Sequence, residues 1–240
     1  MFWRAFKHEL TRSTAMYAVW AAISTVLAIF ARIKLFSLTD MPLFYLMFFG
    51  SVGIMLYRYY CSMHGSEAAY LFTLDLSAKK QMMIRYISML FWSVVTAWAI
   101  GFALMVQGED MSQLLQSQSL SMTLLLASEI TFSVFTLVIL HSAALTLANI
   151  RPFSGRHILY FILFAAIGLG GISLLSRTTA KIIPFYLVAT NSGKILISET
   201  SNTASSISFS FNTLMWDAIF SVACIVSIPA IIRKKLIIAG

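Results

Sequence analysis

Long uncharged apolar runs alternate along this chain with short polar links. The first run, residues 13–31, holds 19 residues without a charged side chain. Runs of this length predict membrane-spanning helices, because about 20 apolar residues cross the hydrocarbon core of a bilayer. The pattern predicts six spans, at about residues 13–31, 41–60, 86–106, 128–150, 158–176 and 213–232.

The segments outside these spans have distinct patterns. Residues 1–12 place Phe2, Trp3, Phe6 and Leu10 on one helical face and basic residues mostly on the other, which predicts an interfacial helix. The longest segment, 177–212, contains an apolar piece at 182–190 that is too short to cross. We expect a re-entrant or surface-lying element there, followed by a loop at 201–208.

Composition supports a membrane-embedded body. Hydrophobic residues make up 59% of the 240 residues, charged residues 11%, and the mean hydropathy is +0.84. These values predict one all-α integral membrane domain over residues 1–240. Two cysteines, Cys61 and Cys224, offer neither a disulfide framework nor metal-ligand spacing.

The basic residues predict the orientation of the spans. Twelve of the seventeen Lys and Arg fall in the N-terminal segment, the 58–85 segment, the 151–156 link and the C-terminus, and five fall in the alternate segments. Basic residues accumulate on the cytoplasmic side, so both termini are expected in the cytoplasm and residues 177–212 outside. The net charge of +8 therefore needs no nucleic-acid partner to explain it.

A polar island at residues 58–85 separates the second span from the third. Ser66 and Ser77 are candidate N-caps within it, and residues 67–72 are compatible with a helix. The island is therefore predicted to be a cytoplasmic loop containing a short helix.

The island also carries a motif. Gly65 and Glu67 precede Tyr70-Leu71, then Thr73-Leu74-Asp75-Leu76-Ser77 and Lys79-Lys80. In this motif, and in its order of spans, the chain resembles the permease subunits of ABC-2-type (type V) exporters, especially the compact six-span ones of Gram-positive bacteria. Asp75 stands where that family commonly has proline.

The resemblance implies a function for the island. It would be a coupling helix seated on a separate ATP-hydrolysing subunit, with Glu67, Tyr70, Leu71, Thr73 and Leu74 as the ATPase-coupling residues. Two permease subunits, identical or homologous, would work with ATP-binding cassette ATPases in a bacterial cell membrane. ATP and Mg would bind to the ATPase, and no cofactor is expected in this chain, which lacks a phosphate-binding G-x-x-x-x-G-K-[ST] loop.

Several polar residues within or near the spans are further candidates. Glu129 and Asp217 are the acids nearest the membrane interior, predicted within about a turn of the outer boundary, where they could attract a cationic substrate. His141 lies in the middle of the fourth span, where we expect an interhelical hydrogen bond. His64 and Glu67 have the spacing of two metal ligands, but no third ligand is close in sequence.

The sequence therefore favours a non-enzymatic permease that exports an amphipathic or hydrophobic molecule, such as a bacteriocin-type or cytolytic peptide or a drug-like compound. One alternative is an intramembrane enzyme such as a CAAX-type protease, whose paired acidic and histidine motifs are missing here. The other is a non-transporting membrane sensor or anchor, which would not need the island.

Overall fold

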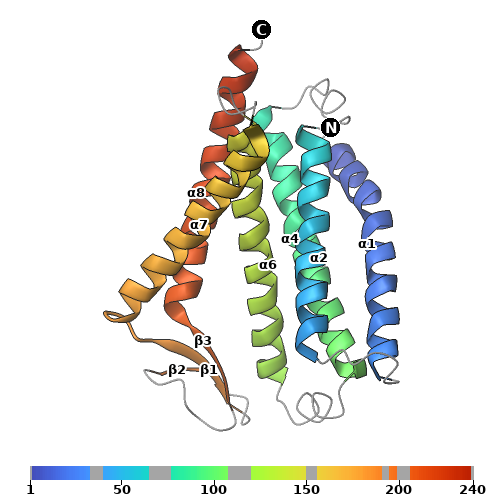
Figure 1. Ribbon diagram of the computed structural model, residues 1–240, viewed down its shortest axis with the longest axis vertical. Coiled ribbons are helices and arrows are strands. Elements are labelled where there is room, and N and C mark those ends of the chain that lie inside the picture. Colours follow the sequence, from blue (N-terminus) through green and yellow to red (C-terminus); the bar gives the residue numbers. More distant parts are fainter. Residues whose placement is uncertain are drawn as a thin grey trace.

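The computed structural model describes residues 2–32, 40–64, 77–107, 120–149, 156–190, 195–198 and 206–238. Within these residues the fold is a bundle of six long helices with one small sheet (Figure 1). The helices are α1 (Phe2–Arg32), α2 (Asp40–Met63), α4 (Ala78–Gln107), α6 (Leu120–Ala148), α7 (His157–Ala180) and α8 (Phe211–Ile238). The predicted all-helical body is present, and the helices cover the predicted spans except at the end of the fourth span, where α6 stops at Ala148 and not at 150.

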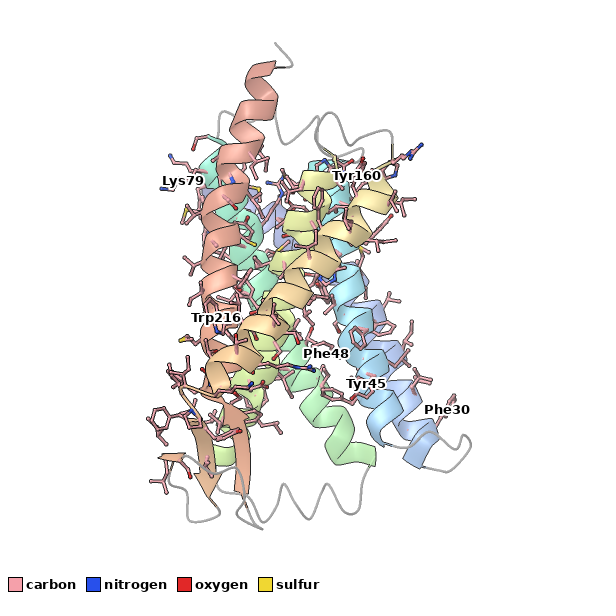
Figure 2. The ribbon with its side chains drawn as sticks, turned by 60° about the vertical axis from the view of Figure 1, so that its left-hand side comes forward. Phe30, Tyr45, Phe48, Lys79, Tyr160 and Trp216 are labelled. Carbon is pink, nitrogen blue, oxygen red and sulfur yellow. The ribbon has the colours of Figure 1, made fainter. Side chains whose placement is uncertain are left out.

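The helices run alternately up and down, so the start of α1 and the end of α8 lie at the same end of the bundle (Figure 1). We call this the terminal end, and the opposite end, which carries the sheet, the sheet end. The last residues of α2 and the first residues of α4 also lie at the terminal end (Figure 1). Figure 2 shows Lys79 of α4 and Tyr160 of α7 toward this end, whereas Phe30 and Tyr45 lie toward the other.

Two helices form the centre of the bundle. α4 contacts α1, α2, α6 and α8, and α6 contacts α2, α4, α7 and α8. Their facing side chains are fully enclosed: Ile100 of α4 and Val134, Val138 and Ile139 of α6 are 0% exposed. Close packing of these side chains is expected to hold the bundle together in lipid, where no hydrophobic force acts between helices.

The outer surface of the bundle is apolar as well. Ile162 and Ile167 of α7 are 58% and 61% exposed, and Val226 of α8 is 69% exposed. Large apolar side chains facing outward suit a lipid environment and not water. Five of the described helices, all except α2, are long and apolar enough to cross a membrane. The chain is a multi-pass membrane protein.

The first helix differs from its prediction. α1 runs without a break from Phe2 to Arg32, so the segment 1–12 is continuous with the first span and is not a separate interfacial helix. Its 31 residues extend over about 46 Å at 1.5 Å per residue. Its amphipathic beginning is explained by packing within the bundle, because Ala5 and Glu9 are buried.

The polar island is shorter than predicted. α2 continues to Met63 and α4 begins at Ala78, so Arg58 and Arg85 belong to helices and not to a cytoplasmic loop. From here on, the island means the segment 64–77 between these two helices. Both arginine side chains are buried. Each binds a polar partner on a neighbouring helix, which compensates for the loss of water. Ser77 caps α4 as predicted: its hydroxyl accepts the Lys80 amide at 3.5 Å, and its carbonyl accepts the Gln81 amide at 3.1 Å.

The segment between α7 and α8 contains a sheet that the sequence analysis did not predict. β1 (Tyr186–Thr190) pairs antiparallel with β2 (Ile195–Ser198) on one side and with β3 (Ser206–Ser210) on the other. The apolar piece at 182–190 is therefore largely a central strand, and the predicted loop at 201–208 ends in a strand. Pairing with two partners satisfies the main-chain groups of β1, which a lone short segment could not do.

Candidate functional site

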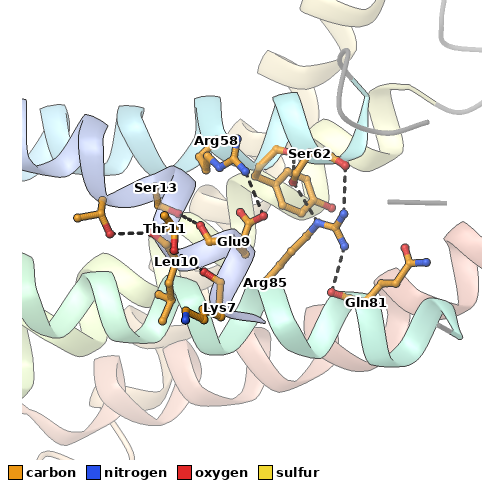
Figure 3. A network of polar contacts seen from close by, with 11 residues as sticks. Lys7, Glu9, Leu10, Thr11, Ser13, Arg58, Ser62, Gln81 and Arg85 are labelled. Atoms are coloured by element: carbon orange, nitrogen blue, oxygen red, sulfur yellow. Dashed lines mark hydrogen bonds and ion pairs between the residues drawn. The ribbon is translucent and has the colours of Figure 1, made fainter. Parts of the chain in front are cut away.

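A buried polar cluster lies where α1, α2 and α4 meet at the terminal end (Figure 3). Its charged members are Glu9, Arg58 and Arg85, which are 5%, 8% and 4% exposed. Charged side chains are almost never enclosed to this degree unless they are paired and hydrogen-bonded. Each of the three comes from a different helix, so the cluster ties those helices together.

Glu9 and Arg58 form the ion pair of this cluster. Arg58 Nη2 donates to Glu9 Oε2 at 3.1 Å, joining α1 to α2 across 49 residues of sequence. The pair is enclosed by protein on both sides, so water screens it little. Removal of either partner would leave the other charge buried without its counter-charge.

Arg85 makes the second connection, between α4 and α2. Its Nε donates to the Ser62 hydroxyl and its Nη2 to the Ser62 carbonyl oxygen, both at 3.0 Å, while Nη1 donates to the Gln81 carbonyl oxygen at 3.0 Å. Ser62 lies in the last turn of α2, where carbonyl groups lack partners within the helix. Arg85 therefore caps the carboxyl end of α2, and its positive charge complements the helix dipole there.

A third connection joins this region to α6. The Tyr59 hydroxyl and Thr146 Oγ1 are 2.6 Å apart, and both side chains are 2% exposed. Thr146 donates its own proton to the Ser142 carbonyl oxygen at 2.9 Å. Tyr59 must therefore be the donor in the bond between the two hydroxyls.

The cluster encloses a small cavity of about 20 Å³ beside Glu9, Arg58 and Arg85. A cavity of this size with several polar walls holds about one water molecule. Formal charges of one carboxylate and two guanidinium groups leave the cluster with an excess of one positive charge. The ion pair and hydrogen bonds of the cluster join α1, α2 and α4, so we call it the junction.

The predicted coupling residues belong to the segment between α2 and α4. Glu67, Tyr70, Leu71, Thr73 and Leu74 lie outside the described residues, but both ends of their segment are defined. α2 ends at Met63, next to Ser62, and α4 begins at Ala78, seven residues before Arg85. His64, at the end of α2, lies 6.0 Å from the Tyr60 ring, and its predicted metal partner Glu67 is not among the described residues.

The two predicted substrate-path acids belong to helices that contact each other, Glu129 to α6 and Asp217 to α8. Both are half-buried. Ser133 donates to Glu129 Oε1 at 3.4 Å. α6 begins at Leu120, eight residues earlier than the predicted span, so Glu129 lies more than two turns inside the helix.

Among the described residues, His141 makes its hydrogen bond within its own helix and not, as predicted, with another helix. Its Nδ1 lies 2.7 Å from the Leu137 carbonyl oxygen, one turn earlier on the same helix. The ring packs near Phe161 of α7, with centroids 6.1 Å apart. The Nδ1 atom of the imidazole is therefore paired within α6.

The charged cluster was missed by the sequence analysis. Glu9 is the single acidic residue before Asp40, and Arg58 and Arg85 both border apolar runs. A lone acid among basic residues, together with arginines inside apolar runs, is the signal that could have predicted buried pairing. In the part of the chain that the structure describes, no three His, Cys, Asp or Glu side chains are grouped to hold a metal ion.

Comparison with known proteins identifies no relative: no family model matches the chain, and no curated protein or solved structure matches it.

Proposed function

We propose that the chain is the permease subunit of an ATP-driven ABC exporter of the ABC-2 type. The single observation that carries the proposal is the junction of Glu9, Arg58 and Arg85 directly beside the island. A force applied to a loop reaches the membrane only if the loop is attached to rigid elements. Here the two helices that flank the island are tied to each other through Ser62 and to α1 through Glu9.

The proposed topology has six spans with both termini and the island in the cytoplasm of a bacterial cell. α2 has 24 residues and is about 36 Å long, enough to cross a 30 Å core. It runs beside α1, α4 and α6 in the up-and-down order of the bundle. The terminal end collects most of the described basic residues, among them Arg4, Lys7, Lys79 and Lys80, as the cytoplasmic side does in membrane proteins.

The proposed mechanism needs two permease subunits and two ATP-binding cassette ATPases, which bind ATP and Mg. Glu67, Tyr70, Leu71, Thr73 and Leu74 contact the ATPase. ATP has different affinities for the open and closed ATPase pairs, and this difference biases the permease between two states. Movement of the island is transmitted to α2 and α4 together because Arg85 links them.

The exported substrate is an amphipathic or hydrophobic molecule, with peptides of the bacteriocin or cytolytic kind as the first class to test and drug-like compounds as the second. Glu129 and Asp217 provide two half-buried carboxyl groups on two helices that contact each other, α6 and α8. Carboxyl groups in this setting attract a cationic group on a substrate that leaves through the sheet end.

Coexpression with candidate ATP-binding cassette ATPases, beginning with any that is encoded beside this chain, tests the proposal. The purified chain alone is expected to show no ATP hydrolysis, because it lacks a phosphate-binding loop. The coexpressed pair is expected to copurify in mild detergent and to hydrolyse ATP. Hydrolysis by the chain alone, or failure of every such ATPase to copurify, would contradict the proposal.

A further inference from the structure

A larger cavity lies between α1, α2 and α4, next to the small cavity of the charged junction, with which it shares Tyr17 and Trp92 as lining residues. Its volume is about 240 Å³. The walls include Tyr17, Trp20 and Ser24 of α1, Ser51 of α2, and Trp92 and Ile100 of α4. None of the described residues that line it is charged. A neutral occupant is therefore favoured over an ion.

Two aromatic contacts keep the walls of this cavity in place. The indole of Trp20 lies against Gly50, where a Cβ atom would have no room, and its Nε1 donates to Ser51 Oγ at 3.1 Å. Tyr17 stacks on Trp92, with ring centroids 3.9 Å apart and planes 6° from parallel. Neither tryptophan can move into the space without breaking these contacts, so the cavity is preformed.

Two buried polar groups of the lining residues lack partners. Ser24 Oγ and Trp92 Nε1 have no hydrogen-bond partner among the described residues, although the side chains are only 2% and 7% exposed. Buried polar groups are nearly always hydrogen-bonded, and an unpaired one is costly. Both groups can donate a proton, so the missing partner is an acceptor.

The cavity reaches the surface along α1. Thr14, Ala18 and Ala21 line it and are exposed. They lie near the middle of a helix that is long and apolar enough to cross a membrane. The opening therefore faces the acyl region of the bilayer, and a ligand arrives by lateral movement through the lipid.

We propose that this cavity binds a small neutral molecule with an apolar body of about ten non-hydrogen atoms and one hydrogen-bond acceptor, as in an aryl or terpenoid alcohol. The size of the ligand follows from the volume of the cavity. A cavity of about 150 Å³ accommodates benzene, so a cavity of about 240 Å³ accommodates a proportionally larger molecule. A lipid acyl chain fits the apolar walls but has no acceptor at this depth. The site lies within one subunit and needs neither an ATPase nor a second permease, so it goes beyond the proposed export function.

Bromine-labelled probes test this site, because a bromine atom in contact with an indole quenches its fluorescence. The probe is 4-bromobenzyl alcohol, and its match without a hydroxyl group is 1-bromo-4-ethylbenzene. The full-length protein is titrated in lipid nanodiscs, where Trp20 and Trp92 report from the cavity wall. Partition into lipid gives a non-saturating background from exposed tryptophans such as Trp98.

Two neighbouring alanines supply matched variants. Ala21 lines the opening, whereas Ala22 is exposed on the same helix and does not line the cavity. Ala21→Phe places a ring in the opening, and Ala22→Phe places the same ring toward lipid. Ser24→Ala removes one of the two unpaired donors with little change of volume.

The proposal predicts saturable quenching by 4-bromobenzyl alcohol in the wild type and in Ala22→Phe, and at least tenfold weaker binding in Ala21→Phe. The alcohol should bind about 2- to 10-fold more tightly than the ethyl compound, as expected for one neutral hydrogen bond. Ser24→Ala should reduce that preference. Equal binding in the Ala21→Phe and Ala22→Phe variants would overturn the site, and equal binding of the two probes by the wild type would overturn the assignment of ligand class.

Discussion

Arg85 of α4 caps the carboxyl end of α2 through Ser62. The guanidinium group binds both the hydroxyl and the carbonyl oxygen of this one residue at 3.0 Å. Ser62 is 0% exposed, so no water replaces either contact. The helices on both sides of the island are therefore joined by a charge-assisted, two-point contact at the base of the segment.

Replacement of Arg85 by lysine tests this contact. A lysine ammonium keeps the charge but lacks the planar fork that holds two Ser62 oxygens together. We expect the free energy of unfolding of Arg85→Lys to fall by about 1–3 kcal/mol, the range for hydrogen bonds to charged groups. Thermal unfolding in detergent measures this change. The control is Lys80→Arg at an exposed position, and an equal effect of both variants would argue against the cap.

The ion pair of Glu9 and Arg58 leads to a second prediction. Glu9→Gln should destabilise the protein by about 3–5 kcal/mol, because it leaves a guanidinium group buried without its counter-charge. Arg58→Met should also destabilise, but the double variant should lose less than the sum of the two single losses. A double-mutant cycle measured by thermal unfolding gives this coupling. Strictly additive losses would mean that the pair does not act as a unit.

The helices could be predicted from sequence because their signal is local. Uncharged runs of about 20 residues permit only a helix in lipid, where the main chain must satisfy its own hydrogen bonds. Helix ends were less well placed, as shown by α6, which begins at Leu120 and not at 128. Hydropathy alone ends a span at the first polar residues, although the helix itself can continue past them.

The polar cluster could not be predicted in the same way. Glu9 and Arg58 are 49 residues apart, and Arg85 reaches Ser62 across 23 residues. No periodicity links such positions, so the sequence predicts a cytoplasmic loop at 58–85 and does not indicate the buried pairing. β1 could not be predicted for the same reason, because its strand conformation depends on pairing with a distant segment. Its partner β3 is separated from it in the sequence by β2.

The orientation of the bundle gives a third prediction. Single cysteines are introduced at Ser77, which is exposed at the start of α4, and at Ile182, which is 79% exposed beyond α7, after replacement of Cys61 and Cys224. A membrane-impermeant maleimide should label the Ile182→Cys variant in intact cells and the Ser77→Cys variant only after permeabilisation, because basic residues stay in the cytoplasm. Labelling of both from the same side would contradict the proposed topology.

The central claim is that the island couples the membrane helices to an ATPase, and variants of Glu67 and Tyr70 test it most directly. The measurement is substrate export together with copurification of the ATPase, in cells that express Tyr70→Ala or Glu67→Lys. Interface hot spots contribute about 2 kcal/mol or more, so either change should abolish assembly and export. Membrane insertion and elution as a single species should stay unchanged, as should all readouts in the exposed control Lys80→Arg. Export and ATPase recovery at wild-type levels in both variants would show that the island is not the coupling element.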